Sequence, residues 1–390
     1  MKRVQLSAAY MPLVDAAPLI VAEEMGFAAA EGLSLDLIPA PSWSSVRDML
    51  AFGRVDAAHL LSSIPVAMAL GLGGVATALS AVSVLSMNGE VVGVGKRLED
   101  RLRASGYGFD FHDARAASKA LGSVLDGKLT IGVPFPFSMH VELLRYWFNA
   151  TGLSENAIEI RTVPPPLMAD ALTSGEIDAF CVGEPWGSTA VEAGVGALLL
   201  PGTAIWSFAP EKVLATRTDW ADTEPHLLGR LMRAVWKSGR WLAQPESHTT
   251  ASEILSRTRY LDLPSEVIDR ALSGRLTISH KGEQRVVDRF VEFHHGAANF
   301  PWRSQAKWIA SRIATRSGLD PLAAMETAAD VFRTDLYRQA LQSTGAEMPG
   351  ASEKLEGAVK DPTAVASASG RLILLPDGFF DGQIFDPLKK

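Results

Sequence analysis

Two stretches of the chain follow one pattern: SWSSVRDMLAFGRVDAAH at residues 42–59 and VPPPLMADALTSGEIDAFCVG at residues 163–183. Each predicts a short amphipathic helix that starts at a Ser or Pro and ends at a Gly, the residue best suited to a left-handed helix end. Each then predicts an apolar strand that opens with Val-Asp-Ala or Ile-Asp-Ala. Because these units recur about 120 residues apart, the sequence predicts two similar α/β lobes whose strand ends face one cleft, a shape that favours ligand binding.

The lobe boundaries are expected at two hinge-like runs, residues 89–95 and 201–210, where turn residues interrupt apolar strands. Alternating strands and helices predict a mostly parallel sheet in each lobe. Beyond residue 218 the pattern is mainly helical, so we expect a helical C-terminal extension on the first lobe. The expected first lobe is residues 1–92 with 208–390, and the expected second lobe is residues 93–207.

Composition describes an ordinary globular protein. The 390 residues are 47% apolar and 21% charged, with a net charge of −7. No run of Lys and Arg is present, which argues against direct binding of nucleic acid. No uninterrupted apolar stretch reaches the roughly 18 residues of a transmembrane helix. The single cysteine, Cys181, excludes an internal disulfide.

The N-terminal segment bears on the compartment. MKRVQLSAAYMPL begins with basic residues, but the apolar segment after it is interrupted by Asp15 and carries Glu23 and Glu24. A secretory signal needs about 7–15 apolar residues and a small-residue cleavage site. If Met1 is the native start, this pattern favours a cytoplasmic protein; if an export signal was removed, the protein is periplasmic.

Signatures of enzymes and cofactors are sparse. The sequence contains no GxSxG, HExxH, CxxC or P-loop pattern, and the glycines at 71–74 do not form a dinucleotide-binding motif. His294 and His295 stand beside Glu292, but no third metal ligand occurs at a suitable spacing. Cys181 lies in an apolar strand, as an inert buried thiol would. We therefore expect no enzyme, no cofactor and no metal.

Polar and aromatic residues at the predicted strand ends and helix starts are the candidates for a site. Trp43 begins one helix, as either a core anchor or a ligand wall, and His59 ends the repeated strand of the first lobe. Gly183, followed by Glu184, holds the same place in the second lobe. His140 begins a helix, and free N–H groups at helix starts attract anions.

Several segments together resemble the nitrate- and bicarbonate-binding proteins of ABC transporters, which have the type II periplasmic-binding-protein fold. FCVGEPW after VPPP is the sharpest match. The matching segments are PLVDAAPLIVAEEMGF (12–27), SWSSVRDMLAFGRVDAAHLL (42–61), HVELLRYW (140–147), VPPPLMADAL (163–172), FCVGEPW (180–186), PEKVLATRTDW (210–220), NFPWRSQAKW (299–308) and DGQIFDP (381–387). The resemblance implies a two-lobed α/β fold that binds a small anion, nitrate or nitrite before bicarbonate.

The resemblance also implies which residues bind the anion. It assigns a Trp to Trp43, a His to His140 and the main cation to Lys212, which taken alone would be a surface charge. Where nitrate binders carry Gln in the loop between the lobes, this chain has Glu90 after Gly89. Either Glu90 is neutral, or the ligand brings a proton or a cation, or the alignment shifts by one residue.

Three functional interpretations follow. A member of this family without an export signal resembles the cytoplasmic nitrate/nitrite sensor, which holds an antiterminator-type regulator and releases it when the ion binds. The second interpretation is the substrate-binding component of an ABC importer, with a membrane permease as its partner. The third is an enzyme of the pyrimidine-thiamine or decarboxylating kind on the same fold, which would need an activated nucleophile in the cleft.

Overall fold

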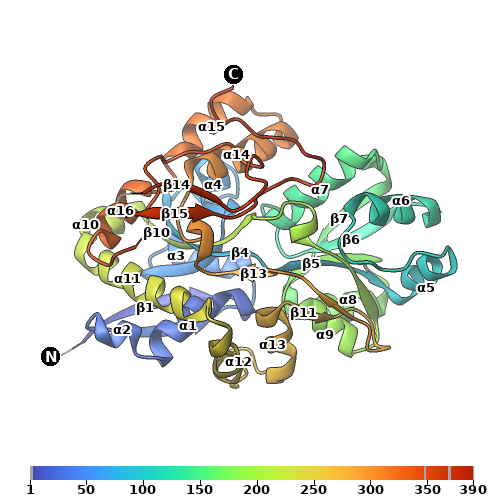
Figure 1. Ribbon diagram of the computed structural model, residues 1–390, viewed down its shortest axis with the longest axis horizontal. Helices are drawn as coiled ribbons and strands as arrows, with labels where there is room; N and C mark the ends of the chain where they lie inside the picture. Colours follow the sequence, from blue (N-terminus) through green and yellow to red (C-terminus); the bar gives the residue numbers. More distant parts are fainter. Residues whose placement is uncertain (1–2, 347, 368–369, 390) are drawn as a thin grey trace.

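The computed structural model describes residues 3–346, 348–367 and 370–389 and consists of two α/β lobes, each built on its own sheet (Figure 1). The six-stranded first sheet has the order β13-β4-β10-β3-β1-β2, with β1 (Val4–Tyr10), β2 (Leu33–Pro39), β3 (Ala57–Leu61), β4 (Leu79–Asn88), β10 (Pro210–Arg217) and β13 (Val291–Glu292). The five-stranded second sheet has the order β7-β6-β8-β5-β9, with β5 (Glu90–Gly95), β6 (Leu129–Val133), β7 (Ile158–Thr162), β8 (Ala179–Gly183) and β9 (Gly196–Pro201). The predicted pair of α/β lobes is therefore confirmed, but the sheets are mixed rather than mostly parallel, because the strand that arrives from the other lobe, β10 or β5, pairs antiparallel with both of its neighbours.

Helices connect and cover the strands of both lobes. Before the second sheet the chain forms α1 (Ala17–Glu24), α2 (Phe27–Ala30), α3 (Trp43–Ala51) and α4 (Ser63–Ala69). The second lobe contains α5 (Lys96–Ala104), α6 (Ala114–Val124), α7 (Met139–Thr151), α8 (Met168–Ser174) and α9 (Trp186–Glu192). After β10 come α10 (Thr218–Thr223), α11 (Pro225–Leu242), α12 (His248–Leu255), α13 (Ser265–Ser273), α14 (Arg303–Ser317), α15 (Pro321–Ala329) and α16 (Thr334–Leu341). Within the described residues, no helix is both long and apolar enough to cross a membrane.

The two repeated sequence units form equivalent elements. Helix α3 is followed by Gly53 and β3, and helix α8 is followed by Gly175 and β8. Both glycines have left-handed backbone angles, with φ of +68° and +76°, as the sequence predicted for helix ends.

The repeated aspartates have the same role in both lobes. The Asp56 carboxylate accepts a hydrogen bond from the backbone N–H of Ser7 in β1 (2.8 Å), and the Asp178 carboxylate accepts one from the backbone N–H of Thr130 in β6 (3.1 Å). Each aspartate also donates its own backbone N–H to the carbonyl of the same partner, Ser7 or Thr130. These reciprocal bonds fix the start of the repeated strand, β3 or β8, against its parallel neighbour, β1 or β6.

The chain passes between the lobes at Gly89 and again at residues 202–209. The first crossing lies before the expected boundary at residue 92, so that boundary was placed too late. Val91–Val94, read as a hinge from the sequence, belongs to β5 and pairs with β8 on one side and β9 on the other. Because paired, buried strand residues cannot swing freely, the link at this first crossing is confined to the turn at Gly89.

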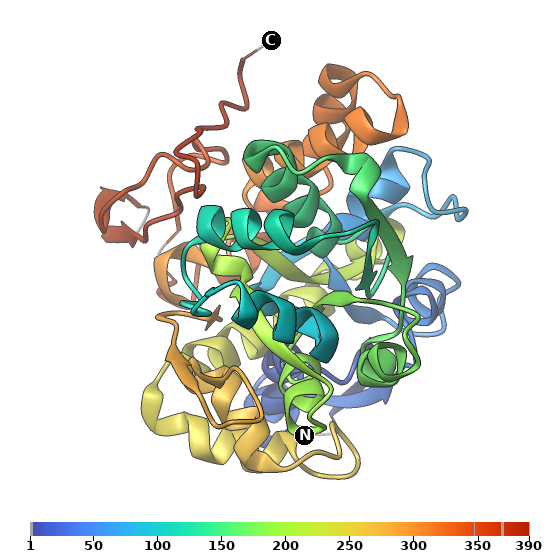
Figure 2. The same cartoon turned by 90° about the vertical axis from the view of Figure 1, so that its right-hand side faces the viewer.

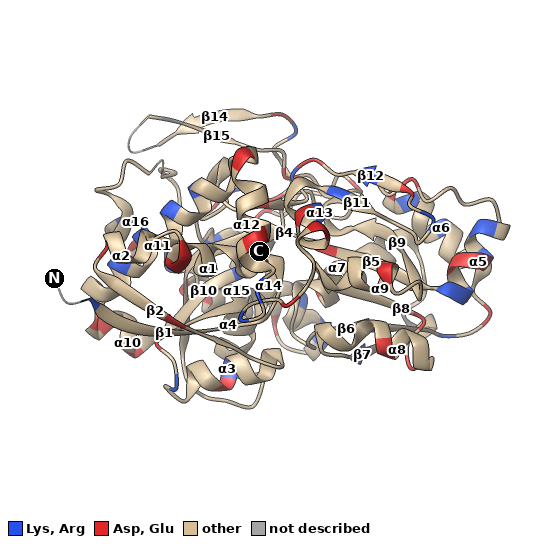
Figure 3. Ribbon diagram, turned by 90° about the horizontal axis from the view of Figure 1, so that it is seen from below, with Lys and Arg blue, Asp and Glu red and all other residues tan. Residues whose placement is uncertain are grey.

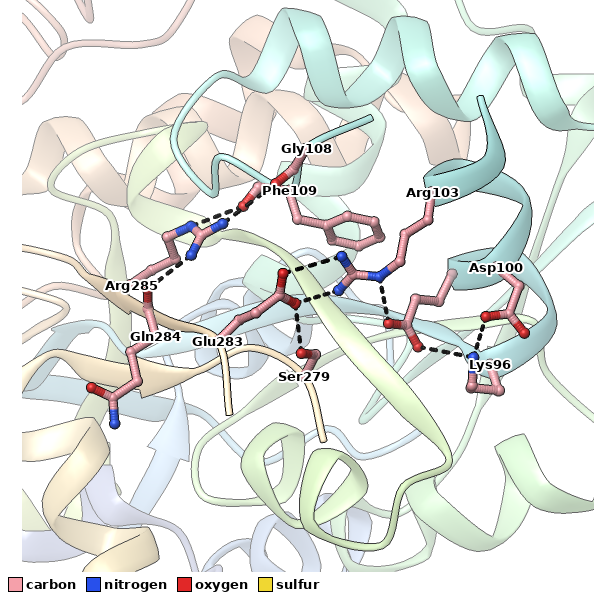
Figure 4. A network of polar contacts seen from close by, with 10 residues as sticks. Lys96, Asp100, Arg103, Gly108, Phe109, Ser279, Glu283, Gln284 and Arg285 are labelled. Carbon is pink, nitrogen blue, oxygen red and sulfur yellow. Dashed lines mark hydrogen bonds and ion pairs between the residues drawn. The ribbon is translucent and has the colours of Figure 1, made fainter. Parts of the chain in front are cut away.

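The C-terminal extension also contacts the second lobe, which the sequence did not predict. The hairpin of β11 (Arg275–Thr277) and β12 (Gln284–Val286) is joined to the second lobe by a polar network (Figure 4). Arg103 of α5 makes two contacts with the Glu283 carboxylate, the longer at 3.2 Å. Arg285 donates to the carbonyl of Phe109 at 2.9 Å. This hairpin of the C-terminal extension therefore bonds the second lobe as well.

The last part of the chain lies along the second crossing. The Trp206 indole donates to the carbonyl of Asp377 (3.0 Å), whose carboxylate is paired with the Lys354 ammonium. Further on, the Tyr146 hydroxyl of α7 donates to Asp381 at 2.8 Å. The extension thus touches the link between the lobes and the second lobe itself. Its second hairpin, β14 (Thr363–Ala366) with β15 (Arg371–Leu374), lies at the edge of the molecule (Figure 2).

Candidate ligand-binding site between the lobes

The candidate site is formed where each sheet receives the strand that arrives from the other lobe. Strand β10 enters the first sheet antiparallel to β3, with Lys212 opposite Leu61. Strand β5 enters the second sheet antiparallel to β8, with Glu90 opposite Gly183. Lys212 and Glu90 are therefore positional equivalents, each at the start of a crossing strand and opposite the last residue of a repeated strand.

Lys212 is fully buried, and two carboxylates surround its ammonium. Its Nζ lies 2.6 Å from Asp15 Oδ2 and 2.6 Å from Glu211 Oε1. Burial alone would lower the pKa of Lys212, but these carboxylates outweigh it and raise the pKa above its ordinary value. Burial raises the pKa of Glu211, although Lys212 opposes the shift. The lysine is thus charged, as predicted, but its charge is already compensated within the protein.

His59 is buried beside Lys212 and holds Asp15 in place. Its Nε2 lies 2.9 Å from Asp15 Oδ1, and its Nδ1 lies 3.4 Å from the backbone nitrogen of Met11. Since the Met11 N–H donates to Nδ1, Nε2 carries the ring proton and donates to Asp15. Burial would raise the pKa of Asp15, but Lys212 and His59 together lower it to about 2. With both nitrogens engaged, His59 positions Asp15 and has no ring nitrogen left for a ligand.

Trp43 is the first residue of α3, and its indole forms one wall of the site. The helix start is fixed by Ser42, whose hydroxyl accepts the backbone N–H of Ser45 at 3.2 Å. The Trp43 ring lies 5.4 Å from the Lys212 ammonium and 5.4 Å from the His59 ring. It is 1% exposed, and its Nε1–H has no hydrogen-bond partner among the described residues. The indole combines a cation–π contact with a free donor.

His140 brings a second donor from the other lobe. It lies in the first turn of α7, whose N-cap Ser138 accepts the backbone N–H of Val141 at 3.3 Å. The ring is 1% exposed, and neither of its nitrogens has a hydrogen-bond partner in the described part of the chain. Its Nδ1 lies 3.4 Å from Glu211 Oε1. Burial and the nearby Lys212 lower the pKa of His140 well below its ordinary value, so its imidazole is neutral.

Glu90 enters the site from the second lobe as a buried acid. It is 1% exposed, and neither carboxyl oxygen is hydrogen-bonded to a described residue. Burial, and then the neighbouring Glu211, raise the pKa of Glu90 to about 8. The carboxyl packs on Gly202, where an added Cβ would lie 1.8 Å from Glu90 Oε1. At neutral pH Glu90 therefore carries a proton and acts as an O–H donor, like the amide of a Gln.

Gly183 lies where the two lobes touch. A Cβ on Gly183 would lie 2.6 Å from Leu13 Cδ2 and 3.6 Å from Asp15 Oδ2, both in the first lobe. Next to it, the Glu184 carbonyl accepts the backbone N–H of Val14 at 2.9 Å. The lobes are therefore closed across the site. Gly89, by contrast, backs onto Val291 and serves as a link, with its carbonyl accepting the Glu184 N–H.

The sequence reasoning missed three members of this cluster: Asp15, Glu211 and Gly202. Asp15 stands alone in a run that is otherwise buried and apolar, and such a lone acid is a usable signal. Glu211 directly precedes Lys212, but strand alternation argues against both neighbours facing one site. The irregular pairing of β10 with β4 at this point brings both side chains inward.

The chemistry of the cluster fits binding. Trp43, His140 and Glu90 offer neutral donors, and Lys212 adds a compensated cation. Cys181 is buried in β8, and burial raises its pKa well above the ordinary value, so the thiol is a poor nucleophile. Among the described residues, no group of three or more His, Cys, Asp or Glu is placed to hold a metal. Two lobes closed on such donors define a solute-binding protein of the type II periplasmic-binding-protein fold.

Comparison with known proteins places the chain in a family. The NMT1-like family model matches residues 1–256. The nitrate/nitrite binding protein NrtA of Synechocystis sp. (strain ATCC 27184 / PCC 6803 / Kazusa) is 30% identical over 97% of this chain and 81% of that protein. The crystal structure of the periplasmic nitrate-binding protein NrtA from Synechocystis PCC 6803 has a TM-score of 0.82 and 27% identity, covering 99% of this chain and 96% of that one. The chain belongs to the NMT1-like family and, within it, to the NrtA-like binding proteins.

A second kind of relative is longer. The nitrate import ATP-binding protein NrtC of the same Synechocystis strain is 30% identical over 88% of this chain, and the chain spans 51% of that protein. These matches confirm the predicted resemblance to the binding proteins of ABC transporters at the level of the family. Membership among the NrtA-like binding proteins also confirms the expectation of a binding protein rather than an enzyme.

Proposed function

We propose that this protein is the substrate-binding component of an ABC-type importer and that it takes a small oxyanion, nitrate or nitrite, between its lobes. Support comes from the relatives, which are a nitrate/nitrite binding protein and a nitrate import ATP-binding protein. In this proposal the two lobes close over the ion, and the closed form is recognised by a membrane permease in the periplasm.

One observation carries the proposal: donors from both lobes converge, without partners among the described residues, beside a buried ammonium. Trp43 comes from the first lobe, His140 and Glu90 come from the second, and Lys212 stands between them. Nitrate is planar, singly charged and weakly basic, with three acceptor oxygens. Neutral N–H and O–H donors and one lysine satisfy such an ion without requiring a surplus of positive charge.

The proton on Glu90 is essential to this proposal. Asp15 is ionised beside the Lys212 ammonium, and an ionised Glu90 would add a second anion next to the ligand. A raised pKa of about 8 removes that repulsion and turns the acid into a donor. Of the explanations left open by the sequence, a neutral Glu90 is the one this pKa favours.

The test is a panel of anions measured by thermal unfolding and calorimetry. We expect nitrate or nitrite to stabilise the protein, by about 2.7 kcal/mol at a hundred times the dissociation constant. Chloride and sulfate should have no effect. His140→Ala should weaken binding by about 1–3 kcal/mol, whereas His226→Ala, at an exposed histidine outside the site, should not. Absence of stabilisation by nitrate, nitrite and bicarbonate alike would refute the proposal.

The cytoplasmic sensor is the second candidate, and one feature of the chain favours it. The C-terminal extension contacts both lobes, so opening and closing would alter an outer surface that a regulator could recognise. A sensor would co-purify with an antiterminator-type protein without nitrate and release it when nitrate is added, since ligand and partner affinities are linked. An importer subunit would instead fractionate with the periplasm and bind the permease when loaded.

A further inference from the structure

A separate cavity of about 740 Å³ lies between α11, the segment 289–299 and strand β15. It shares no residue with the interlobe site. Its volume falls in the range of small-molecule sites, which is roughly 300–1,000 Å³. The hairpin that carries β15, which lines the cavity, lies at the periphery of the molecule (Figures 2 and 3).

Large apolar side chains form much of the cavity wall. Trp236 of α11, Tyr337 of α16 and Leu372 of β15 line it and are 8%, 3% and 4% exposed. The Tyr337 ring is fixed edge-on against Phe300, with 5.3 Å between centroids, and no hydrogen bond to its hydroxyl is found within the described residues. The wall therefore provides rigid aromatic surface and one hydroxyl that can bond a ligand.

The cavity also has a positive edge. Arg240 and Arg289 line it, are exposed, and form no ion pair within the described part of the chain. The acid that shares the cavity, Glu292, is already satisfied. Its Oε1 accepts the backbone N–H groups of residues 293–295 at 2.9–3.0 Å. Two guanidinium groups are therefore available beside an apolar wall.

We propose that this cavity is a second binding site, for an anionic headgroup carried on an aromatic or branched apolar body. Arg240 and Arg289 would hold the headgroup, because the guanidinium fork matches the oxygens of carboxylates, sulfonates and phosphates. Trp236 and Leu372 would cover the body. A bare inorganic anion, the proposed ligand of the interlobe site, would leave this apolar wall without a partner.

The experiment uses two fluorescent probes with the same apolar body: anilinonaphthalene sulfonate and the uncharged N-phenylnaphthylamine. Both are titrated against the full-length protein with nitrate present. We expect the sulfonate to bind at one site and about tenfold more tightly than the uncharged probe, because the guanidinium groups contact only the sulfonate. Arg240→Gln combined with Arg289→Gln should remove that difference and leave binding of the uncharged probe unchanged.

The control is Arg54→Gln combined with Arg161→Gln, two arginines that do not line the cavity. It should preserve the sulfonate preference, and both double variants should show the thermal unfolding of the parent. Hydrogen exchange with the sulfonate bound should slow in peptides covering residues 236–240 and 289–297. The proposal is overturned if the two double variants bind the sulfonate equally, or if the two probes bind the parent equally.

Discussion

The two lobes share a framework and differ in the residue that each presents to the candidate site between them. In both, a repeated helix and strand are fixed by an aspartate, Asp56 or Asp178, and a strand arriving from the other lobe pairs with the repeated strand. At equivalent positions on those arriving strands stand Lys212 and Glu90. One is a charged base held by carboxylates, and the other is an acid that keeps its proton. Equivalent positions of the same scaffold thus hold a charged ammonium and a neutral carboxylic acid, because burial and the neighbouring carboxylates act differently on a lysine and on a glutamate.

The comparison also separates the residues that hold the fold from those that form the candidate site. Asp56 and Asp178 bond groups within their own lobe: Asp56 accepts the backbone N–H and the hydroxyl of Ser7, and Asp178 accepts the backbone N–H of Thr130 and pairs with Arg97. Lys212 and Glu90 lie in the buried cluster between the lobes. Substitutions of Asp56 and Asp178 should therefore lower stability in a similar way in both lobes. Substitutions of Lys212 and Glu90 should instead differ from each other in their effects on stability and on ligand binding.

The largest effect is expected from Lys212→Met. The substitution leaves Asp15 buried without its cation, so the free energy of unfolding should fall by about 3–5 kcal/mol and nitrate binding should be lost. Urea unfolding measures the first effect and calorimetry the second. Lys96→Met, which removes an exposed ion pair, should cost less than about 1 kcal/mol. Adding Asp15→Asn to Lys212→Met should restore part of the stability; a fully stable Lys212→Met variant would contradict this view of the site.

Next in size is a pH dependence set by Glu90. In the unfolded chain the acid loses its proton near the ordinary pKa of 4.5, whereas in the closed protein it keeps the proton to about 8. The folded state therefore binds more protons between these values, and its stability falls as pH rises through that range. Nitrate affinity should fall in the same direction, by up to about tenfold per pH unit.

Glu90→Gln supplies the comparison for this prediction. The amide keeps a donor and cannot ionise, so its nitrate affinity should be flat with pH and tighter than the parent's at pH 8. Glu184→Gln removes another buried acid with a raised pKa and should leave the Glu90 dependence in place. If Glu90→Gln abolishes binding at every pH, the ligand is not a plain anion but brings its own proton or positive charge.

A smaller effect is expected from Gly183→Ala. The new methyl group would lie against Leu13 of the other lobe, so it should hinder closure and weaken nitrate binding by about 1–3 kcal/mol. Each lobe can keep its own packing, so the urea midpoint should change little. Small-angle scattering with saturating nitrate should show a more open molecule than the parent. Gly175→Ala, at a helix end away from the lobe contact, should instead lower stability and leave affinity unchanged.

The last predictions test the framework itself and expect no effect on nitrate affinity. Asp56→Ala and Asp178→Ala should each lower the free energy of unfolding by about 1–3 kcal/mol, because each leaves a strand N–H without its partner. Asp56 accepts bonds from both the backbone and the hydroxyl of Ser7, whereas the second partner of Asp178 is the exposed Arg97, whose ion pair contributes little, so the loss of Asp56 should be the larger. Nitrate affinity in the folded variants should remain that of the parent. A loss of affinity without a loss of stability would place these residues in the site.

Local pattern predicted the elements well where one signal dominated. The Gly that ends each repeated helix, the apolar strand after it and the helix starts at Trp43 and His140 were all read from a few adjacent residues. The predicted hinge, residues 89–95, includes the crossing at Gly89 but extends too far, because Val91–Val94 contains a Gly and small apolar residues, as a flexible link also does. Only the strands on either side of β5 show that this run is fixed.

The sequence by itself predicted two α/β lobes, since strand periodicity and helix ends are local properties of the chain, and its resemblance to the nitrate- and bicarbonate-binding proteins implied that Lys212, Glu90, His140 and Trp43 belong to one site. The tertiary structure decided the charge state of those residues and which of their polar atoms are free to bind a ligand. Whether Lys212 is compensated, whether Glu90 keeps its proton and whether His59 has a free nitrogen depend on Asp15 and Glu211. Such charge states depend on distances and burial, which exist only once distant segments have packed together.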